Sequence, residues 1–203
     1  MIKCNVTAVG TITRSASMRE SKEGQSFMSF SMTVCIFNDS GTSFPLELSV
    51  STDADEALLA AFAAGKRISV SGQMTPRKRG DVIYYNLKAA SCSFTTAGAE
   101  DSVSGDMEFR GTVGKQIRSH QDKHGKPFVT FSAYSSDKVG EDYTFIWNRF
   151  ILFDDTPGEW FRPGAGFNAS GQMELSVYKD RIEMTCRVRE ISEWEKSFTT
   201  SVQ

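Results

Sequence analysis

Alternating apolar and polar residues run through much of this chain. Between Ser29 and Ile36 the even-numbered positions are apolar, and the odd-numbered positions carry Ser, Thr or Cys. A period of two residues is typical of a β-strand with one buried face. Runs rich in strand-forming residues recur at 67–72, 82–89 and 128–134. The pattern predicts a protein built mainly from β-strands.

One segment of the first half has the composition of a helix. Residues 53–64 combine Ala and Leu with acidic residues at the start, and Gly65 suits the position after a helix end. In the second half, the corresponding segment 154–161 is broken by proline and glycine, so we expect only a turn or a brief helix there. The apolar face of the first helix would consist of Leu58, Leu59 and Phe62.

The sequence also repeats itself after about 100 residues. The segment GQSFMSFS at 24–31 returns as GKPFVTFS at 125–132, and Gly72-Gln73-Met74 returns as Gly-Gln-Met at 171–173. Because these anchors keep one order and nearly one register, the repeated unit is a whole domain, not a short solenoid repeat.

The repeat predicts two domains of similar size. We expect the first at 1–95 and the second at 107–196, followed by a tail at 197–203. The segment 96–106 is small, polar and acidic, which is typical of a linker.

The order of elements within a repeat narrows the fold class. Three strands, a helix and two further strands follow one another in the first repeat, which is the order of the OB-fold, a five-stranded Greek-key barrel. Other small barrels share this order. We therefore expect an all-β protein with a short helix, made of two tandem OB-fold barrels.

Three motifs in this order resemble the bacterial single-stranded DNA-binding protein family. WNRFILF at 147–153 is similar to the family's third strand, and Gly-x-x-Phe-x-x-Phe-Ser leads into the second strand of both repeats. A strand ending in Gly-Gln-Met is the third motif. The resemblance implies a tandem OB-fold member that forms a homodimer. It also implies sequence-independent binding of single-stranded DNA in replication, recombination, repair or the transfer of a mobile element.

The first repeat and the end of the chain depart from this family. The third strand of the first repeat, 44–50, has no Trp and contains Pro45, which belongs at a strand start or edge. The chain stops at 199–203 without the family's acidic, aromatic tip, so we do not expect recruitment of other enzymes through a tail. These departures keep open an alternative function, an OB-fold protein-interaction scaffold in a replication or transfer complex.

Single-stranded nucleic acid is held by aromatic faces that stack on bases and by a basic groove that follows the phosphates. Trp147 and Phe153 would share one strand face, for which the alternative is a place in the core. In the first repeat we expect Phe44 in the place of the Trp and the cluster 76–80 in the loop between the fourth and fifth strands. That cluster has the alternative of a solvated hairpin tip. Only one of Tyr84 and Tyr85 would face a ligand.

The second repeat is expected to differ from the first in its charges. Its first loop would be basic, and Tyr178 would hold a place comparable to the two tyrosines of the first repeat. The residues expected to contact nucleic acid are Trp147, Arg149, Phe153, Tyr178, Lys115, Arg118, Lys123 and Lys126 in the second repeat, and Phe44, Arg77, Lys78, Arg79, Tyr84 and Tyr85 in the first.

Composition argues against several other classes of protein. The net charge of −2 disfavours a duplex binder coated in basic residues. His120 and His124 lack the Glu of a zinc-protease motif, and no phosphate-binding or dinucleotide fingerprint occurs. We therefore expect no enzyme, no catalytic residue, no metal and no cofactor. Four widely spaced cysteines, with no signal peptide and no membrane span, favour a cytoplasmic protein.

Overall fold

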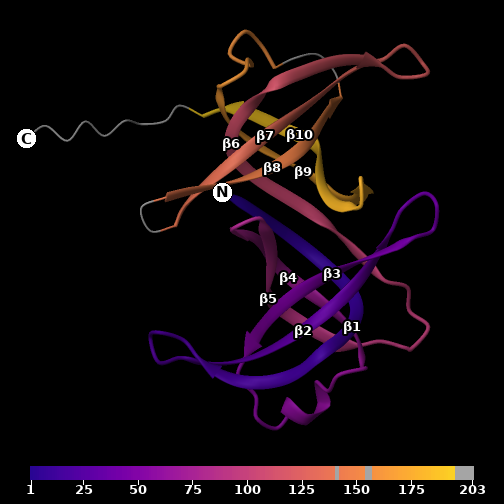
Figure 1. Cartoon of the computed structure of the whole chain (residues 1–203), viewed down its shortest axis with the longest axis vertical. Coiled ribbons are helices and arrows are strands. Elements are labelled where there is room, and N and C mark those ends of the chain that lie inside the picture. The colour runs from indigo at the N-terminus through magenta and orange to yellow at the C-terminus, as the bar shows by residue number, and fades with distance from the viewer. Residues whose placement is uncertain (140–141, 154–156, 195–203) are drawn as a thin grey trace, which may run out of the picture. The chain divides into compact units, whose positions relative to one another are not determined.

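The computed structural model describes residues 1–139, 142–153 and 157–194 (Figure 1). In this part of the chain, every regular element except one short 3-10 turn is a β-strand. The strands form two barrels of five, one from each sequence repeat.

The first barrel closes on itself. Its hydrogen-bonded order is β2-β3-β5-β4-β1, and β1 also pairs with β2. All neighbours are antiparallel except β3 and β5, which run parallel. This is the OB-fold topology. The strands are β1 (Ile2–Glu20), β2 (Ser26–Phe37), β3 (Ser43–Asp53), β4 (Arg67–Arg79) and β5 (Val82–Phe94).

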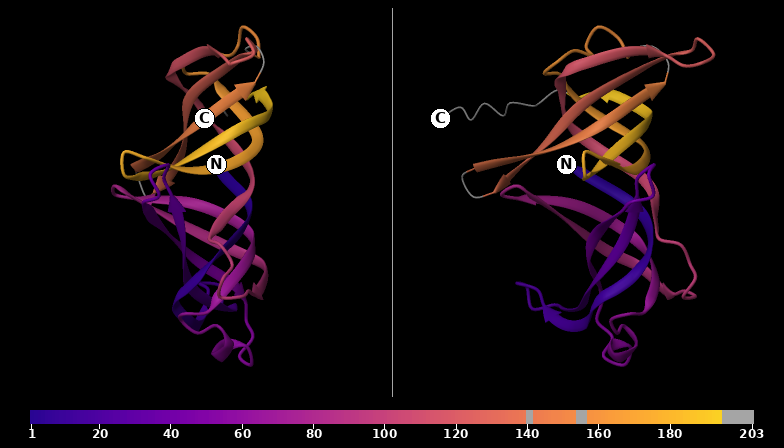
Figure 2. Two further views of the ribbon diagram at one scale, coloured as in Figure 1. Left: turned by 90° about the vertical axis from the view of Figure 1, so that its right-hand side faces the viewer. Right: turned by 45° about the vertical axis from the view of Figure 1, so that its right-hand side comes forward.

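The second barrel repeats this topology. Its order is β6-β7-β8-β10-β9, β6 also pairs with β9, and β8 and β10 are parallel. The two tandem OB-folds expected from the sequence are therefore confirmed (Figures 1 and 2). The strands are β6 (Ser102–Gln121), β7 (Pro127–Val139), β8 (Asp142–Phe153), β9 (Gly166–Tyr178) and β10 (Arg181–Glu193).

Contacts between residues divide the chain into two compact units, and each unit combines segments that are distant in the sequence. One unit contains Lys3–Asp106 and also Met173–Met184, the tip of the β9–β10 hairpin. The other contains Met107–Gln172, Met1–Ile2 and the residues from Thr185 onwards. The boundaries expected from the repeat stay a prediction, and the tail at 197–203 lies outside the described residues.

The alternation of the strands produces the cores. Phe30, Met32 and Val34 of β2 are fully buried, as their spacing predicts. In the second barrel, Phe109, Phe131, Phe150 and Phe167 form one aromatic cluster, with ring centroids 4.7 to 5.7 Å apart. Burial of such rings supplies most of the driving force for folding.

The helix expected at 53–64 does not form. Only Leu59–Ala61 is helical, as one 3-10 turn, η1, which lies at one end of the first barrel (Figure 2). The side chain of Asp55 accepts hydrogen bonds from the backbone N–H groups of Ala57 at 3.0 Å and Leu58 at 3.3 Å, as an N-cap residue does, so this end of the segment does not prevent a longer helix. The Phe62 carbonyl accepts a hydrogen bond from Ala16 of β1 at 2.9 Å. A segment this short gains too little from helical bonds to resist this tie.

Two buried phenylalanines hold the equivalent segments of the two repeats. Phe62 packs on Phe30 with centroids 5.2 Å apart, and Phe161 packs on Phe131 at 4.9 Å. The described part of the second segment, from 157, contains the expected turn, in which the Phe161 N–H donates to the Gly158 carbonyl at 3.1 Å. In both repeats the segment is therefore tied to the barrel through one aromatic ring.

The repeated glycines lie where two backbones approach closely. A Cβ on Gly72 would collide with the carbonyl of Lys88, and one on Gly171 would collide with the carbonyl of Arg187. In the first barrel, this contact coincides with a shift of register between β4 and β5. The Gly-Gln-Met anchor of both repeats is thus explained by steric room at a bulge.

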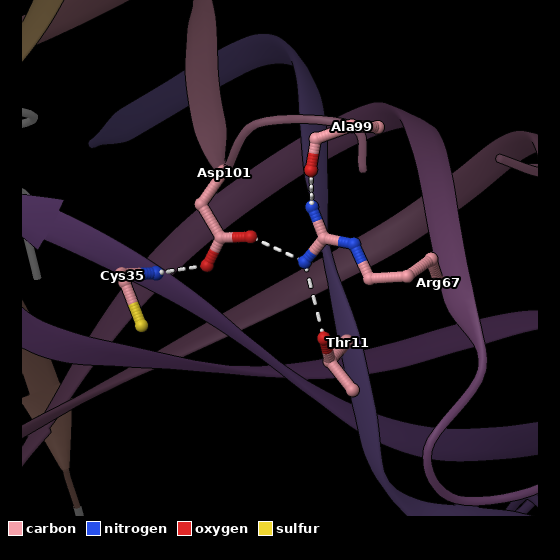
Figure 3. A network of polar contacts seen from close by, with 5 residues as sticks. All are labelled: Thr11, Cys35, Arg67, Ala99 and Asp101. Atoms are coloured by element: carbon pink, nitrogen blue, oxygen red, sulfur yellow. Dashed lines mark hydrogen bonds and ion pairs between the residues drawn. The ribbon is translucent and has the colours of Figure 1, made fainter. Parts of the chain in front are cut away.

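A partly buried ion pair fixes the segment before β6 to the first barrel. Arg67 of β4 pairs with Asp101 and also donates to the carbonyl of Ala99 and, at 3.1 Å, to the hydroxyl of Thr11 (Figure 3). The second carboxylate oxygen of Asp101 accepts a 2.6 Å bond from the Cys35 N–H. Strand β6 begins at Ser102, within the expected linker, so this connection is ordered against the barrel.

These contacts make the stability of the first barrel depend on pH. Burial alone would raise the pKa of Asp101, but the Cys35 N–H and the Arg67 guanidinium hold it below its ordinary value. The ionised form is therefore favoured in the folded state. Its contribution is complete above the unfolded pKa of about 3.9 and is lost as pH falls through the lower folded pKa.

We expect Asp101→Asn to lower the free energy of unfolding at pH 7 by about 1–3 kcal/mol, because a charge-assisted bond is lost and Arg67 stays partly buried. The deficit should shrink toward pH 3. Urea denaturation at both pH values measures it, with Glu100→Gln as the control for removing an exposed neighbouring charge. An equal deficit at pH 7 and pH 3 would contradict the assignment.

Candidate nucleic-acid interface

The outer face of β8 carries a row of exposed aromatic side chains. Trp147 is 56% exposed and Phe153 is 48% exposed, whereas Ile146, Phe150 and Leu152 on the opposite face are buried. Trp147 and Phe153 therefore share a face as predicted, and this face points to solvent instead of the core. Large exposed rings in a row are uncommon on a soluble domain and indicate a binding surface.

One end of this face holds what we term the Phe153 cluster, made of His120, Phe128, Phe153 and Arg187. The His120 ring stacks on Phe128 with centroids 4.9 Å apart, and Phe128 lies 6.1 Å from Phe153. The Arg187 guanidinium lies over Phe153 at 5.9 Å. His120 is oriented by a 2.8 Å hydrogen bond to the hydroxyl of Thr130. The cluster crosses four neighbouring strands, β6, β7, β8 and β10.

The other end holds the Trp147 cluster, made of Tyr134, Phe145 and Trp147. The Tyr134 ring lies 4.9 Å from Trp147 and 5.4 Å from Phe145. The indole also lies close to Gly114 of β6, where a Cβ would come within 2.9 Å of it. The glycine leaves room for the ring to lie against the sheet, which fixes the plane on which a base would stack.

A polar, basic floor separates the two clusters. Phe128 and Tyr134, one from each cluster, are six residues apart on β7, a separation of about 20 Å along an extended strand. A hollow of about 390 Å³ lies on the floor beside Phe128. Its polar lining consists of Gln116, Arg118, His120, Thr130, Ser132 and Arg149.

The strand register shows that the first barrel has no such face. Trp147 pairs with Tyr134, and at the equivalent position of the first barrel Glu47 pairs with Thr33. Phe153 pairs with Phe128, whereas Asp53 is its counterpart in β3. Two acidic residues thus replace the two exposed rings.

The expectation that Phe44 takes the place of the Trp is therefore wrong. Phe44 corresponds to Thr144 and shares its face with Leu46 and Leu48, which are buried. Phe44 is the only aromatic residue of this strand, but the register is set by pairing with β2. The position of Trp147 belongs to Glu47.

The residues expected to contact nucleic acid in the first barrel, Phe44 included, do lie close together. They line one groove of about 1120 Å³ beside the outer face of β3. Within it, Tyr84 is exposed and pairs across the hairpin with Arg77, while burial raises the pKa of Tyr85. Tyr84 is thus the more exposed of the two, but both tyrosines line the groove, so the expectation that at most one of them faces a ligand stays a prediction. The predicted residues in this groove are Phe44, Arg77, Lys78, Arg79, Tyr84 and Tyr85.

The basic cluster of the first repeat does not lie in a loop. β4 continues to Arg79 and β5 begins at Val82, so that only Gly80 and Asp81 form the turn. The cluster was placed in a loop because proline and charged residues break the apolar pattern. Pairing with β5 extends the strand regardless of that pattern.

The predicted basic loop of the second repeat is also partly strand. Lys115 and Arg118 lie in β6, and only Lys123 and Lys126 belong to the turn that follows. Arg118 faces the polar floor, because it pairs with Thr130. Lys115 is exposed but is not among the residues that line the hollow.

Tyr178 holds a different place from the one expected. It ends β9 and therefore corresponds to Arg79 at the end of β4, not to the tyrosines of β5. It is half exposed, and the Lys179 ammonium lies 5.3 Å from its ring centroid.

Sequence reasoning missed several members of the two clusters. In the sequence, His120 belongs only to a possible metal-ligand spacing and Phe128 only to a repeated motif. No sequence motif points to Tyr134 or Arg187. The signal that could have identified Tyr134 is the period of two along β7, counted from Phe128, which brings Tyr134 onto the same face.

The described residues carry no sign of a metal centre or a membrane-spanning helix. In 1–139, 142–153 and 157–194, no three His, Cys, Asp or Glu side chains gather closely enough to hold a metal ion. No helix in the same ranges is long and apolar enough to cross a bilayer.

Comparisons with known proteins give matches only among solved structures. No protein-family model and no curated protein matches the chain. The single-stranded DNA-binding protein of Thermus aquaticus is 15% identical over 97% of this chain and 94% of its own, with a TM-score of 0.47. The small single-stranded DNA-binding protein of Streptomyces coelicolor is 17% identical over 49% of this chain and 96% of its own, with a TM-score of 0.39.

The exposure of Trp147 can be tested without any ligand. Trp147 is more exposed than Trp160 and Trp194, both of which are half-buried. We expect acrylamide to quench the emission of Trp147 most strongly, so that Trp147→Phe removes more of the quenchable fluorescence than Trp160→Phe does. Equal quenching constants for the two variants would contradict the exposed position.

Proposed function

We propose that the protein binds single-stranded DNA through the outer face of the second barrel, largely regardless of the base sequence of the DNA. The observation that carries this proposal is the pair of exposed aromatic clusters on β7 and β8 with arginines between them. Bases would stack on Trp147 and Phe153, and Arg118 and Arg149 would contact the strand between the two clusters. Stacking of this kind contributes about 1–3 kcal/mol per base and tolerates any base.

In this proposal the first barrel contributes mainly charge. The groove beside β3 offers Arg77, Lys78 and Arg79 for phosphates, and Tyr84 for one base. The acidic Glu47 and Asp53 lie where the second barrel stacks, so the two halves contact the strand unequally. The protein would act as a homodimer that coats and protects DNA during replication, recombination, repair or the transfer of a mobile element.

The same acidic residues favour a second candidate function. A barrel whose outer face carries Glu47 and Asp53 repels phosphates there and suits a protein partner instead. The chain would then serve as an interaction scaffold in a replication or transfer complex, with nucleic acid bound weakly or not at all.

Titration with oligo-dT at two salt concentrations separates the two functions. DNA binding predicts quenching of Trp fluorescence and an affinity that falls as salt rises, because counterions are released. No quenching and no gel shift at micromolar oligonucleotide would refute DNA binding and leave the scaffold.

The site assignment is tested by Trp147→Ala. We expect binding of oligo-dT to weaken roughly 5- to 150-fold, because a stacking ring worth about 1–3 kcal/mol is removed. The matched control is Phe37→Ala, which removes an equally exposed ring from the first barrel. Both are measured by anisotropy of labelled oligonucleotide. Equal affinities for the two variants would show that Trp147 does not contact the DNA, without contradicting DNA binding by the protein.

Whether the two barrels contact DNA unequally is tested by introducing the aromatic residues of β8 at the equivalent positions of β3. Glu47→Trp combined with Asp53→Phe should tighten oligo-dT binding by roughly tenfold and lengthen the footprint, because two repulsive charges become stacking rings. Titrations with oligonucleotides of increasing length measure both effects. The converse Trp147→Glu should weaken binding more than Trp147→Ala does. A transplanted face without effect would show that the first barrel lies away from the strand.

A further inference from the structure

The outer face of β7 has an unusual order of side-chain sizes. Phe128, Thr130, Ser132 and Tyr134 follow one another on this face as large, small, small and large residues. The two small hydroxyl residues leave the hollow of about 390 Å³ described above. This volume lies near the lower end of sites for small organic ligands, roughly 300–1,000 Å³.

The strands on either side of β7 supply hydrogen-bond donors to this hollow. Arg118 of β6 pairs with Thr130, and Arg149 of β8 pairs with Ser132. The amide oxygen of Gln116 accepts a bond from Arg118 at 3.5 Å. No carboxylate belongs to the described lining, so the hollow matches a ligand edge that carries acceptors.

We propose that this hollow takes one base of the bound strand and that it favours guanine. The inference rests on the proposed function and adds one point of base preference to an otherwise sequence-independent surface. Guanine presents two neighbouring acceptors, O6 and N7, which fit the fork of an arginine. Adenine places a donor beside N7, and thymine has its acceptors on either side of a donor. A purine also covers more of the adjoining Phe128 ring than a pyrimidine does.

The first barrel lacks this arrangement. The positions of Arg118 and Arg149 are occupied there by Ser17 and Ser49, which pair with Ser29 and Ser31. No guanidinium group therefore projects from these two positions of the first barrel, and the preference belongs to the second barrel alone. One guanine in a long oligonucleotide should consequently fix the position at which the protein binds along it.

The experiment compares oligonucleotides that differ in one base. The reference is an oligo-dT of about 15 nucleotides, near the largest site size of one OB fold. Its central residue is replaced by dG, dA, dC or 7-deaza-dG, which lacks the N7 acceptor, and binding is followed by fluorescence anisotropy. We expect dG to tighten binding roughly fivefold or more, the lower range for a bidentate contact, and 7-deaza-dG to lose most of this gain.

Two conservative variants assign the contact. Arg118→Lys and Arg149→Lys keep the charge but remove the fork. At least one of them should abolish the preference for dG, measured within each variant as the ratio of its affinities for the dG oligonucleotide and for oligo-dT, so that a general loss of affinity does not affect the result. Arg162→Lys, at an exposed arginine outside the hollow, is the control and should keep the preference.

The outcomes separate this inference from the proposed function. Tight binding of oligo-dT with no preference for dG means that the hollow holds a phosphate or stays empty, which overturns the inference and leaves the function intact. An equal gain from 7-deaza-dG or a larger gain from dC overturns the assignment to guanine. Failure to bind any of the oligonucleotides overturns both.

Discussion

The whole structure depends on the closure of each barrel by its first strand. β1 pairs with β4 from Cys4 to Thr11 and then with β2 from Thr11 to Glu20, and the strand must cross from one neighbour to the other within a few residues. At this crossing, a Cβ on Gly10 would collide with the carbonyl of Thr33, and one on the repeated Gly111 with the carbonyl of Tyr134. The absence of a side chain is therefore the condition for a closed core. Closure in turn decides which face of every strand is inside.

A closed barrel separates stability from binding. The inward residues of both repeats must fill one volume, so they stay apolar and tightly packed. The outward residues are under no such constraint. The second repeat could therefore present Trp147 and Phe153 where the first presents Glu47 and Asp53, on the same framework and in the same register. One fold thus carries two surfaces of opposite chemistry.

The failures of sequence reasoning have a common cause in pairing between distant strands. The helix expected at 53–64 rests on local propensity, but a hydrogen bond from β1 to the Phe62 carbonyl ties the segment to the barrel, and only one 3-10 turn forms. Phe44 was matched to Trp147 by residue type, although pairing with β2 assigns that position to Glu47. In both cases the local pattern was real, and the neighbouring strand decided the outcome.

The sequence by itself determined the number of barrels, their strand content and the sharing of one face by Trp147 and Phe153, because repeats and a period of two are local properties. Only the tertiary structure decided that this face is exposed, that His120, Phe128 and Tyr134 join it, and that Arg118 and Arg149 flank one hollow. Those residues come from three different strands. Their meeting depends on the register of closure, which no short stretch of sequence contains.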